Sequence, residues 1–134
     1  MRDKESAIEW LEYAKRDYES ALLLKTHQNP PAIEIICYHC QQAVEKSLKS
    51  LLALAGVYIQ KTHDIHTLKK LCKKQYPEIS DVISDDHADI FSDFATVTRY
   101  PDSKKDFSKV DMDFALKYSK PVLDCAERLI NTEE

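Results

Sequence analysis

A single glycine, Gly56, in 134 residues is the feature that most restricts how this chain can fold. Tight β-hairpin turns depend on glycine or asparagine at positions with positive φ, so the chain has little material for sheets built from hairpins. The usual share of glycine in proteins is about 7%. We therefore expect an all-α protein with short connections, in which Gly56 ends one of the helices.

Hydrophobic periodicity supports this expectation and predicts five helices. Apolar residues recur at spacings of three and four over residues 3–25, 32–55, 64–75, 80–98 and 108–131. Leu22 and Ile90 are assigned to the buried stripes of their helices, and Pro121 is expected to kink the last one. The pattern predicts an up-and-down bundle of about five helices, and the length predicts a single domain over residues 1–134.

The segment 32–55 is expected to be the central helix. Its first half, AIEIICYHC, is apolar on nearly every side. Its second half alternates apolar and polar residues with a helical period, which favours an amphipathic helix. In that half the polar residues predicted to face outward are Glu45, Lys46, Lys49 and Ser50.

Cys37 and Cys40 form a C-x-x-C motif, and His63 and His66 follow later in the chain. Structural zinc sites favour three to five residues between two histidine ligands, whereas two separate this pair. The cysteines also lie in an apolar helix with no βαβ context for a redox motif. Zinc binding and redox chemistry are thus weak alternatives. We expect all four cysteines, Cys72 and Cys125 included, to be reduced and buried, and we predict no metal or cofactor.

The sequence THDIH at residues 62–66 is predicted to begin a helix, with Thr62 or Asp64 as its cap. Backbone donors and the helix dipole at such a position favour an anion. Two interpretations of His63 stay open: a surface residue in a capping turn, or part of a polar lid over a ligand or catalytic site.

Charge is segregated along the next part of the chain. Residues 61–74 hold five lysines against one acid, and residues 78–93 hold six acids and no lysine or arginine. These are either two solvated helix faces that attract each other, or a basic strip for phosphates that Arg99, Lys104 and Lys105 reinforce. The net charge of −4 gives no general attraction for nucleic acid.

Residues 96–106, TVTRYPDSKKD, interrupt the helical pattern, because Pro101 prevents the preceding helix from continuing far. Arg99 is a permanent cation at this helix exit. It is either an anion-recognition group or an anchor that pairs with Asp17 or Glu45 inside the bundle.

Three stretches together resemble the HEPN domain family. QQAVEKSLKSLL at 41–52 resembles the long second helix, THDI-x-x-L at 62–68 resembles the start of the third, and RYPD at 99–102 resembles a loop of one prokaryotic branch. The resemblance implies a helical bundle, often a homodimer, and often the partner of a minimal nucleotidyltransferase in a toxin–antitoxin-like pair. Many members are metal-independent ribonucleases that use an arginine and a histidine four to six residues later. No histidine follows Arg99 at that spacing, so the usual pair is absent.

We accordingly expect a module that binds a nucleotide or the phosphates of RNA. Arg99 and His63 are the candidates for catalysis. The phosphate-binding candidates are Arg99, His63, Lys46, Asp64, Tyr100, Asp102, Lys104 and Lys105. The alternatives are a ribonuclease toxin with a displaced Arg/His site and a purely structural interaction scaffold. No apolar run is long enough for a membrane span and the N-terminus has no signal region, so a cytoplasmic protein is expected.

Overall fold

The chain folds into α-helices, as the sequence predicts. Our computed structural model describes residues 3–59, 61–99 and 106–132, and for residues 97–99 it describes the backbone alone. The helices are α1 (Lys4–His27), α2 (Ile33–Ala55), α3 (Ile65–Gln75), the short 3-10 helix η1 (Pro77–Asp81), α4 (Asp85–Arg99) and α5 (Lys109–Thr132). The predicted fourth helix is therefore two elements. None of the described helices combines the length and the apolar character that crossing a bilayer requires.

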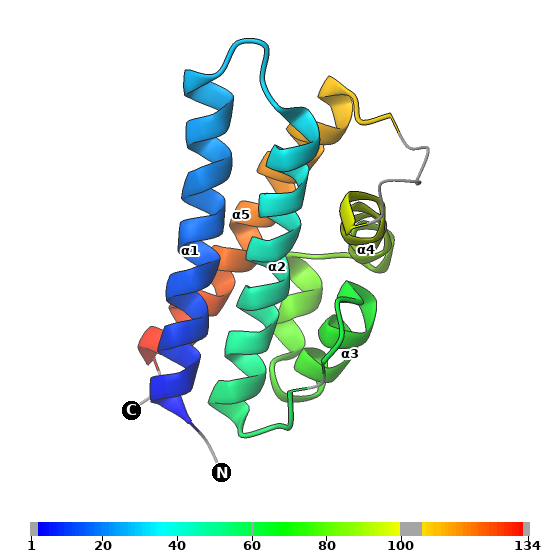
Figure 1. The fold of residues 1–134 in the computed structure, drawn as a ribbon. Coiled ribbons are helices and arrows are strands. Elements are labelled where there is room, and N and C mark those ends of the chain that lie inside the picture. Colours follow the sequence, from blue (N-terminus) through cyan, green and yellow to red (C-terminus); the bar gives the residue numbers. More distant parts are fainter. Residues whose placement is uncertain (1–2, 60, 100–105, 133–134) are drawn as a thin grey trace.

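Helix α2 lies at the centre of the molecule. It runs antiparallel to α1 at its side, α5 packs behind the two, and α3 and α4 lie along its other flank (Figure 1). One hydrophobic cluster draws buried side chains from all five α-helices. This central place agrees with the nearly continuous apolar surface of the first half of α2.

Gly56 ends α2, as predicted. Its φ of 74° lies in the left-handed region, which a residue without Cβ enters at least cost. The Gly56 N–H donates to the carbonyl of Ala53 at 3.0 Å, and the Val57 N–H donates to that of Leu52 at 2.9 Å. These two bonds form a Schellman motif, which turns the chain toward α3.

Aromatic side chains fix α4 against α5. The ring of Phe91 lies 5.3 Å from that of Phe114, and the ring of Phe94 lies 5.6 Å from that of Phe107. His87 adds an edge contact with Phe114 at 4.9 Å. Offset and edge-to-face pairs of this kind stabilise beyond simple burial. The cluster therefore sets the position of α4, the helix that ends at Arg99.

Some predicted faces were wrong. Glu45, Lys49 and Ser50 were expected to face outward and are buried. Of the four polar residues on that face, Lys46 alone keeps partial exposure. The cause is tertiary: His63, from the link before α3, contacts Glu45, and Trp10 of α1 lies beside Lys49.

Two apolar residues depart from the prediction in the opposite direction. Leu22 and Ile90 were expected to be buried and are exposed. Leu22 faces a groove between α1 and α5. Ile90 lies on the outer side of α4, where Asp86, Asp89 and Asp93 are also exposed.

Candidate functional site

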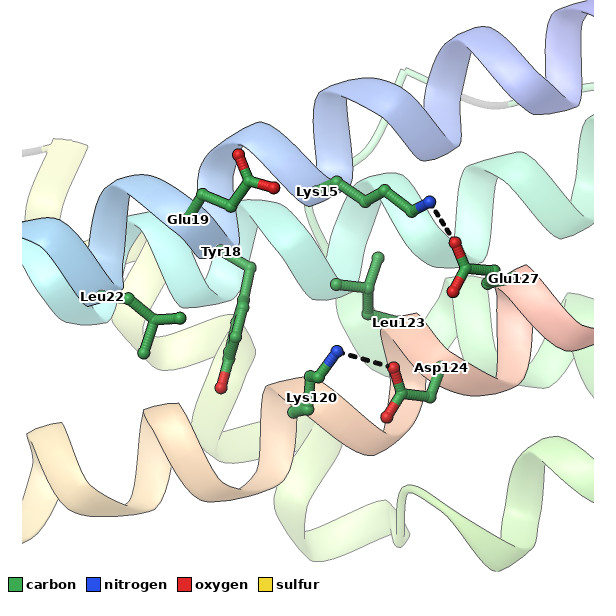
Figure 2. A pocket seen from close by; sticks show the side chains of 8 residues that line it. All are labelled: Lys15, Tyr18, Glu19, Leu22, Lys120, Leu123, Asp124 and Glu127. Atoms are coloured by element: carbon green, nitrogen blue, oxygen red, sulfur yellow. Dashed lines mark hydrogen bonds and ion pairs between the residues drawn. The ribbon is translucent and has the colours of Figure 1, made fainter.

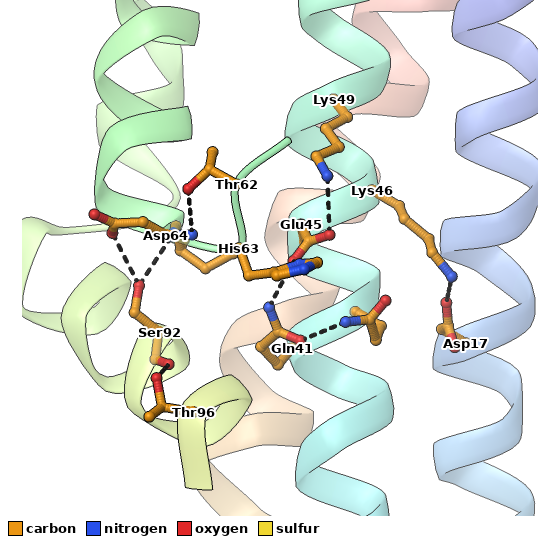
Figure 3. A network of polar contacts seen from close by, with 12 residues as sticks. Asp17, Gln41, Glu45, Lys46, Lys49, Thr62, His63, Asp64, Ser92 and Thr96 are labelled. Atoms are coloured by element: carbon orange, nitrogen blue, oxygen red, sulfur yellow. Dashed lines mark hydrogen bonds and ion pairs between the residues drawn. The ribbon is translucent and has the colours of Figure 1, made fainter. Parts of the chain in front are cut away.

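A buried carboxylate, Glu45 of α2, is the centre of a polar network (Figure 3). It accepts hydrogen bonds from His63 Nδ1 at 2.9 Å, from Lys49 Nζ at 3.1 Å and from Gln41 Nε2 at 3.1 Å. Its side chain is only 4% exposed, and that of Lys49 is 8% exposed. The network thus joins α2 to the link before α3 through a charge that is almost out of water.

The partners of Glu45 keep it ionised. Burial by itself raises the pKa of a carboxyl group. Here the hydrogen bond from His63, the charge of Lys49 and the hydrogen bond from Gln41 outweigh burial, and the pKa of Glu45 lies below its ordinary value. An ionised carboxylate can only accept hydrogen bonds, so Nδ1 of His63 carries a proton.

Helical spacing on α2 explains half of this arrangement. Gln41, Glu45 and Lys49 follow one another at intervals of four, which stacks their side chains along one face of the helix. Gln42 extends the row, because its Nε2 donates to Oε1 of Gln41 at 2.8 Å. The same spacing occurs on solvated helix faces, so the sequence alone did not separate a buried network from a surface ladder.

Asp64 caps α3 and ties it to α4. Its carboxylate accepts from the His66 N–H at 3.1 Å, from Thr67 Oγ1 at 2.9 Å and from Ser92 Oγ at 3.2 Å. Ser92 also accepts from the Ile65 N–H at 2.9 Å. Partial burial by itself would raise the pKa of Asp64. The hydrogen bonds from Thr67 and Ser92 outweigh it, and the pKa lies below its ordinary value.

Thr62 and Asp64, the two candidate caps of this turn, have different roles. Asp64 is the cap of α3, and Thr62 Oγ1 instead accepts from the Asp64 N–H at 3.1 Å. His63 is half-exposed and reaches back to α2 through its bond to Glu45. Ser92 was not predicted, because a serine in the middle of a helical pattern gives no signal of the turn it will meet.

Lys46 lies apart from the Glu45 network. Its Nζ contacts Asp17 Oδ2 of α1 at 2.6 Å (Figure 3). The other oxygen of Asp17 contacts His39 Nδ1 at 2.9 Å. Lys46 was predicted to bind phosphate, and here it links α1 to α2. Asp17 and Glu45, the two carboxylates proposed as anchors for Arg99, thus both have cationic partners.

The segregated charges of α3 and α4 partly pair with each other. Lys69 Nζ contacts Asp85 Oδ1 at 2.8 Å, and His66 Nδ1 contacts Asp89 Oδ1 at 3.0 Å. The hydrogen bond and charge of Lys69 hold the pKa of Asp85 below its ordinary value. The interpretation of two mutually attracting helix faces fits these pairs.

Arg99 is the last residue of α4. It follows Ser92 by seven residues, so the two positions share a face of the helix and are roughly 10 Å apart along its axis. Ser92 on this face meets the start of α3, next to His63. The Arg99 side chain and the predicted site residues Tyr100, Asp102, Lys104 and Lys105 lie outside the described part of the chain.

A groove of about 320 Å³ lies on the opposite side, between α1 and α5 (Figure 2). Lys15 pairs with Glu127 across it, and Lys120 pairs with Asp124 at 2.8 Å along its wall. Its cations are thus already neutralised by carboxylates of the same groove. None of the sequence motifs falls here, and we place no ligand in it.

The cysteines are buried, as expected. Burial raises the pKa of the Cys40 thiol to about 12, and burial likewise raises the pKa values of Cys72 and Cys125. Within the described ranges, no three histidine, cysteine or acidic side chains gather closely enough to hold a metal ion.

Comparisons with known proteins agree with this architecture. The family model of the HEPN domain matches residues 7–129. The crystal structure of TT1696 from Thermus thermophilus is 26% identical, covers 91% of this chain and 96% of its own, and superposes with a TM-score of 0.70. The crystal structure of ST0689, an archaeal HEPN homologue, is 23% identical to this chain and has a TM-score of 0.69. The match covers 94% of this chain and 98% of ST0689. A search of curated proteins finds no match.

Proposed function

The chain belongs to the HEPN domain family, and from that premise we propose that it binds the phosphate of a nucleotide or of RNA where α2, α3 and α4 meet. The observation that carries the proposal is the Glu45–His63 pair at the start of α3. It brings a half-exposed histidine, fixed by a buried carboxylate, to the flank of α2 that faces α4. Helix α4 packs against α2 and ends at Arg99, and we propose that the Arg99 side chain reaches the same flank.

The chemistry of this junction suits an anion. With protons on both ring nitrogens, His63 would donate to Glu45 through Nδ1 and to a phosphate oxygen through Nε2. Arg99 is the natural second group, because a guanidinium can bind two phosphate oxygens at once. Tyr100, Asp102, Lys104 and Lys105 follow Arg99 in the sequence and stay predicted phosphate-binding residues outside the described part of the chain.

Calorimetric titration with nucleoside monophosphates, nucleoside triphosphates and short RNA tests this proposal. A hydrogen bond to a charged group contributes roughly 1.5–3 kcal/mol, so His63→Ala should weaken binding about tenfold or more. His27, an exposed histidine at the far end of α1, provides the matched control His27→Ala. Equal affinity in wild type and His63→Ala would remove His63 from the site.

For a partner, we propose a minimal nucleotidyltransferase in a toxin–antitoxin-like pair, with this chain as a homodimer. Membership of the family supports this step. A nucleotidyltransferase encoded beside this chain should co-purify with it when both are expressed together. If the neighbouring gene encodes no such enzyme, or if the two proteins elute separately, the partnership is excluded.

One observation favours a second function, cleavage of RNA. A histidine whose Nδ1 is held by a buried carboxylate is the arrangement that orients a general acid or base. Glu45 and His63 have this relation, and Arg99 would then stabilise the charged phosphate. Cleavage of RNA in the presence of a chelator should be lost in His63→Ala and reduced in Glu45→Gln. Equal cleavage by wild type and His63→Ala would exclude this function.

A further inference from the structure

Cations and aromatic rings gather where α1 meets α2, next to the Glu45 network. Arg16 Cζ lies 5.3 Å from the centre of the Tyr13 ring, and Lys46 Nζ lies 5.8 Å from it. Lys49 Nζ lies 5.5 Å from the Trp10 ring. Two further contacts of this geometry involve α5, Lys117 over the Tyr118 ring and Lys120 over the Tyr18 ring, so three of the five in the described chain share the α1–α2 surface.

The side chains of this surface differ in how strongly they are held. Lys46 is fixed by Asp17, and Lys49 is fixed by Glu45. Arg16 is exposed, and within the described chain it has no carboxylate partner. The Tyr13 residue is 54% exposed. The exposed Tyr13 ring and the unpaired Arg16 therefore lie next to Lys46 and Lys49, whose positions are fixed by ion pairs.

We propose that the surface formed by Trp10, Tyr13, Arg16 and Lys46, beside the buried Lys49, is a stacking platform for single-stranded RNA. A base would stack on Tyr13, and a backbone phosphate would contact Arg16. The proposal rests on the proposed phosphate-binding function and extends its site along the strand. Aromatic rings next to cations are what proteins use to bind single strands, because every base has a face to stack.

Lys49 connects the platform to the phosphate site. Its ammonium group contacts Glu45 and also lies over the Trp10 ring. Lys49 is itself buried, so a strand would run from His63 across α2 to the exposed Tyr13 and Arg16 of α1 without contacting it. The exposed lysines Lys70, Lys73 and Lys74 of α3 are a different kind of surface, because no described ring contact of a cation lies among them. A duplex would not use the platform, since its bases are already stacked in pairs.

Binding of a short labelled oligouridylate, followed by fluorescence anisotropy on the full chain, tests the proposal. Loss of one base-stacking contact weakens binding roughly 5- to 150-fold, so the affinity of Tyr13→Ala for the oligouridylate should be lower by a factor in that range. Tyr13→Trp keeps an aromatic face and should retain the wild-type affinity. Arg16→Gln should reduce the slope of log affinity against log salt by about 0.7, the contribution of one phosphate on a single strand. Tyr13→Ala should leave that slope unchanged.

Two control variants separate this platform from general surface effects. Tyr58→Ala removes a tyrosine that is 79% exposed but has no cation over its ring in the described chain. Lys117→Gln removes a cation that lies 5.3 Å from the Tyr118 ring, on α5. Both should bind as wild type does. Trp10 is the only tryptophan, so its fluorescence should change when RNA occupies the platform.

The outcomes distinguish the platform from the function on which it rests. If the oligouridylate binds wild type and Tyr13→Ala equally, and Arg16→Gln keeps the salt slope, the platform is overturned while phosphate binding stands. If nucleoside monophosphates bind but the oligouridylate does not, the platform is again overturned alone. If neither ligand binds wild type, the phosphate-binding function and the platform fail together.

Discussion

Replacing Glu45 by alanine should strongly destabilise the protein, although helical periodicity assigns residue 45 to the outward face of its helix. The change removes the acceptor of three hydrogen bonds, from His63, Lys49 and Gln41. His63 is half-exposed and can turn to water. Lys49 is almost fully covered, so its ammonium group would lose its carboxylate without gaining solvent.

The expected loss in the free energy of unfolding follows from the buried, unpaired charge of Lys49. Breaking a buried ion pair by removing one partner costs about 3–5 kcal/mol. A domain of ordinary stability has about 5–15 kcal/mol in total, so Glu45→Ala should remove a large share. The double variant Glu45→Leu/Lys49→Met should be more stable than Glu45→Ala, because apolar replacement of both partners leaves no buried charge.

Urea unfolding followed by circular dichroism measures this loss, provided that the slope of the unfolding free energy against urea concentration is the same in all variants. The matched control is Asp124→Ala, which breaks the exposed pair Lys120–Asp124, also four residues apart, whose side chains are 50% and 52% exposed. That change should cost about 0.2–1 kcal/mol. A loss below about 1 kcal/mol for Glu45→Ala would refute the account of a buried pair.

Three further predictions concern stability and reactivity. The pKa of Glu45 is lowered in the folded protein, so its contribution is fully present above the unfolded value of about 4.3 and is lost as pH falls through the folded value. Urea midpoints across acidic pH should therefore fall less steeply for Glu45→Gln than for wild type, and parallel curves would contradict this. Gly56→Ala should cost about 1 kcal/mol because φ is 74° there, whereas an unchanged melting temperature would mean that the left-handed cap does not form. Cys40 and Cys72 should resist a thiol reagent until the chain unfolds, and rapid labelling under native conditions would disagree with their burial.

Local sequence signals were enough to predict the helices. The spacing of apolar residues gave the extent of α1, α2, α3 and α5 to within one or two residues. Gly56 and Asp64 marked a helix end and a helix start, because each satisfies backbone groups of its own turn. Features of this kind depend on neighbours in sequence, so they can be read from it.

The polar network depends instead on contacts between distant segments. His63, which contacts Glu45, lies 18 positions after it, and Trp10, which lies beside Lys49, comes 39 positions before it. Ser92 meets the start of α3 only because of how α4 packs. Helical periodicity assigns such residues to a solvated face, since it contains no information about which other segment covers them.

A titration that locates the ligand on the chain tests the central claim most directly. Amide chemical shifts of isotope-labelled protein would be followed by NMR as a nucleoside monophosphate, and then a short single-stranded RNA, is added. We predict that the largest changes fall on residues 41–49 and 62–66 and on the last two turns of α4, around Arg99. Changes confined to the α1–α5 groove at Lys15 and Lys120, or no change with either ligand, would contradict a phosphate site at the junction of α2, α3 and α4.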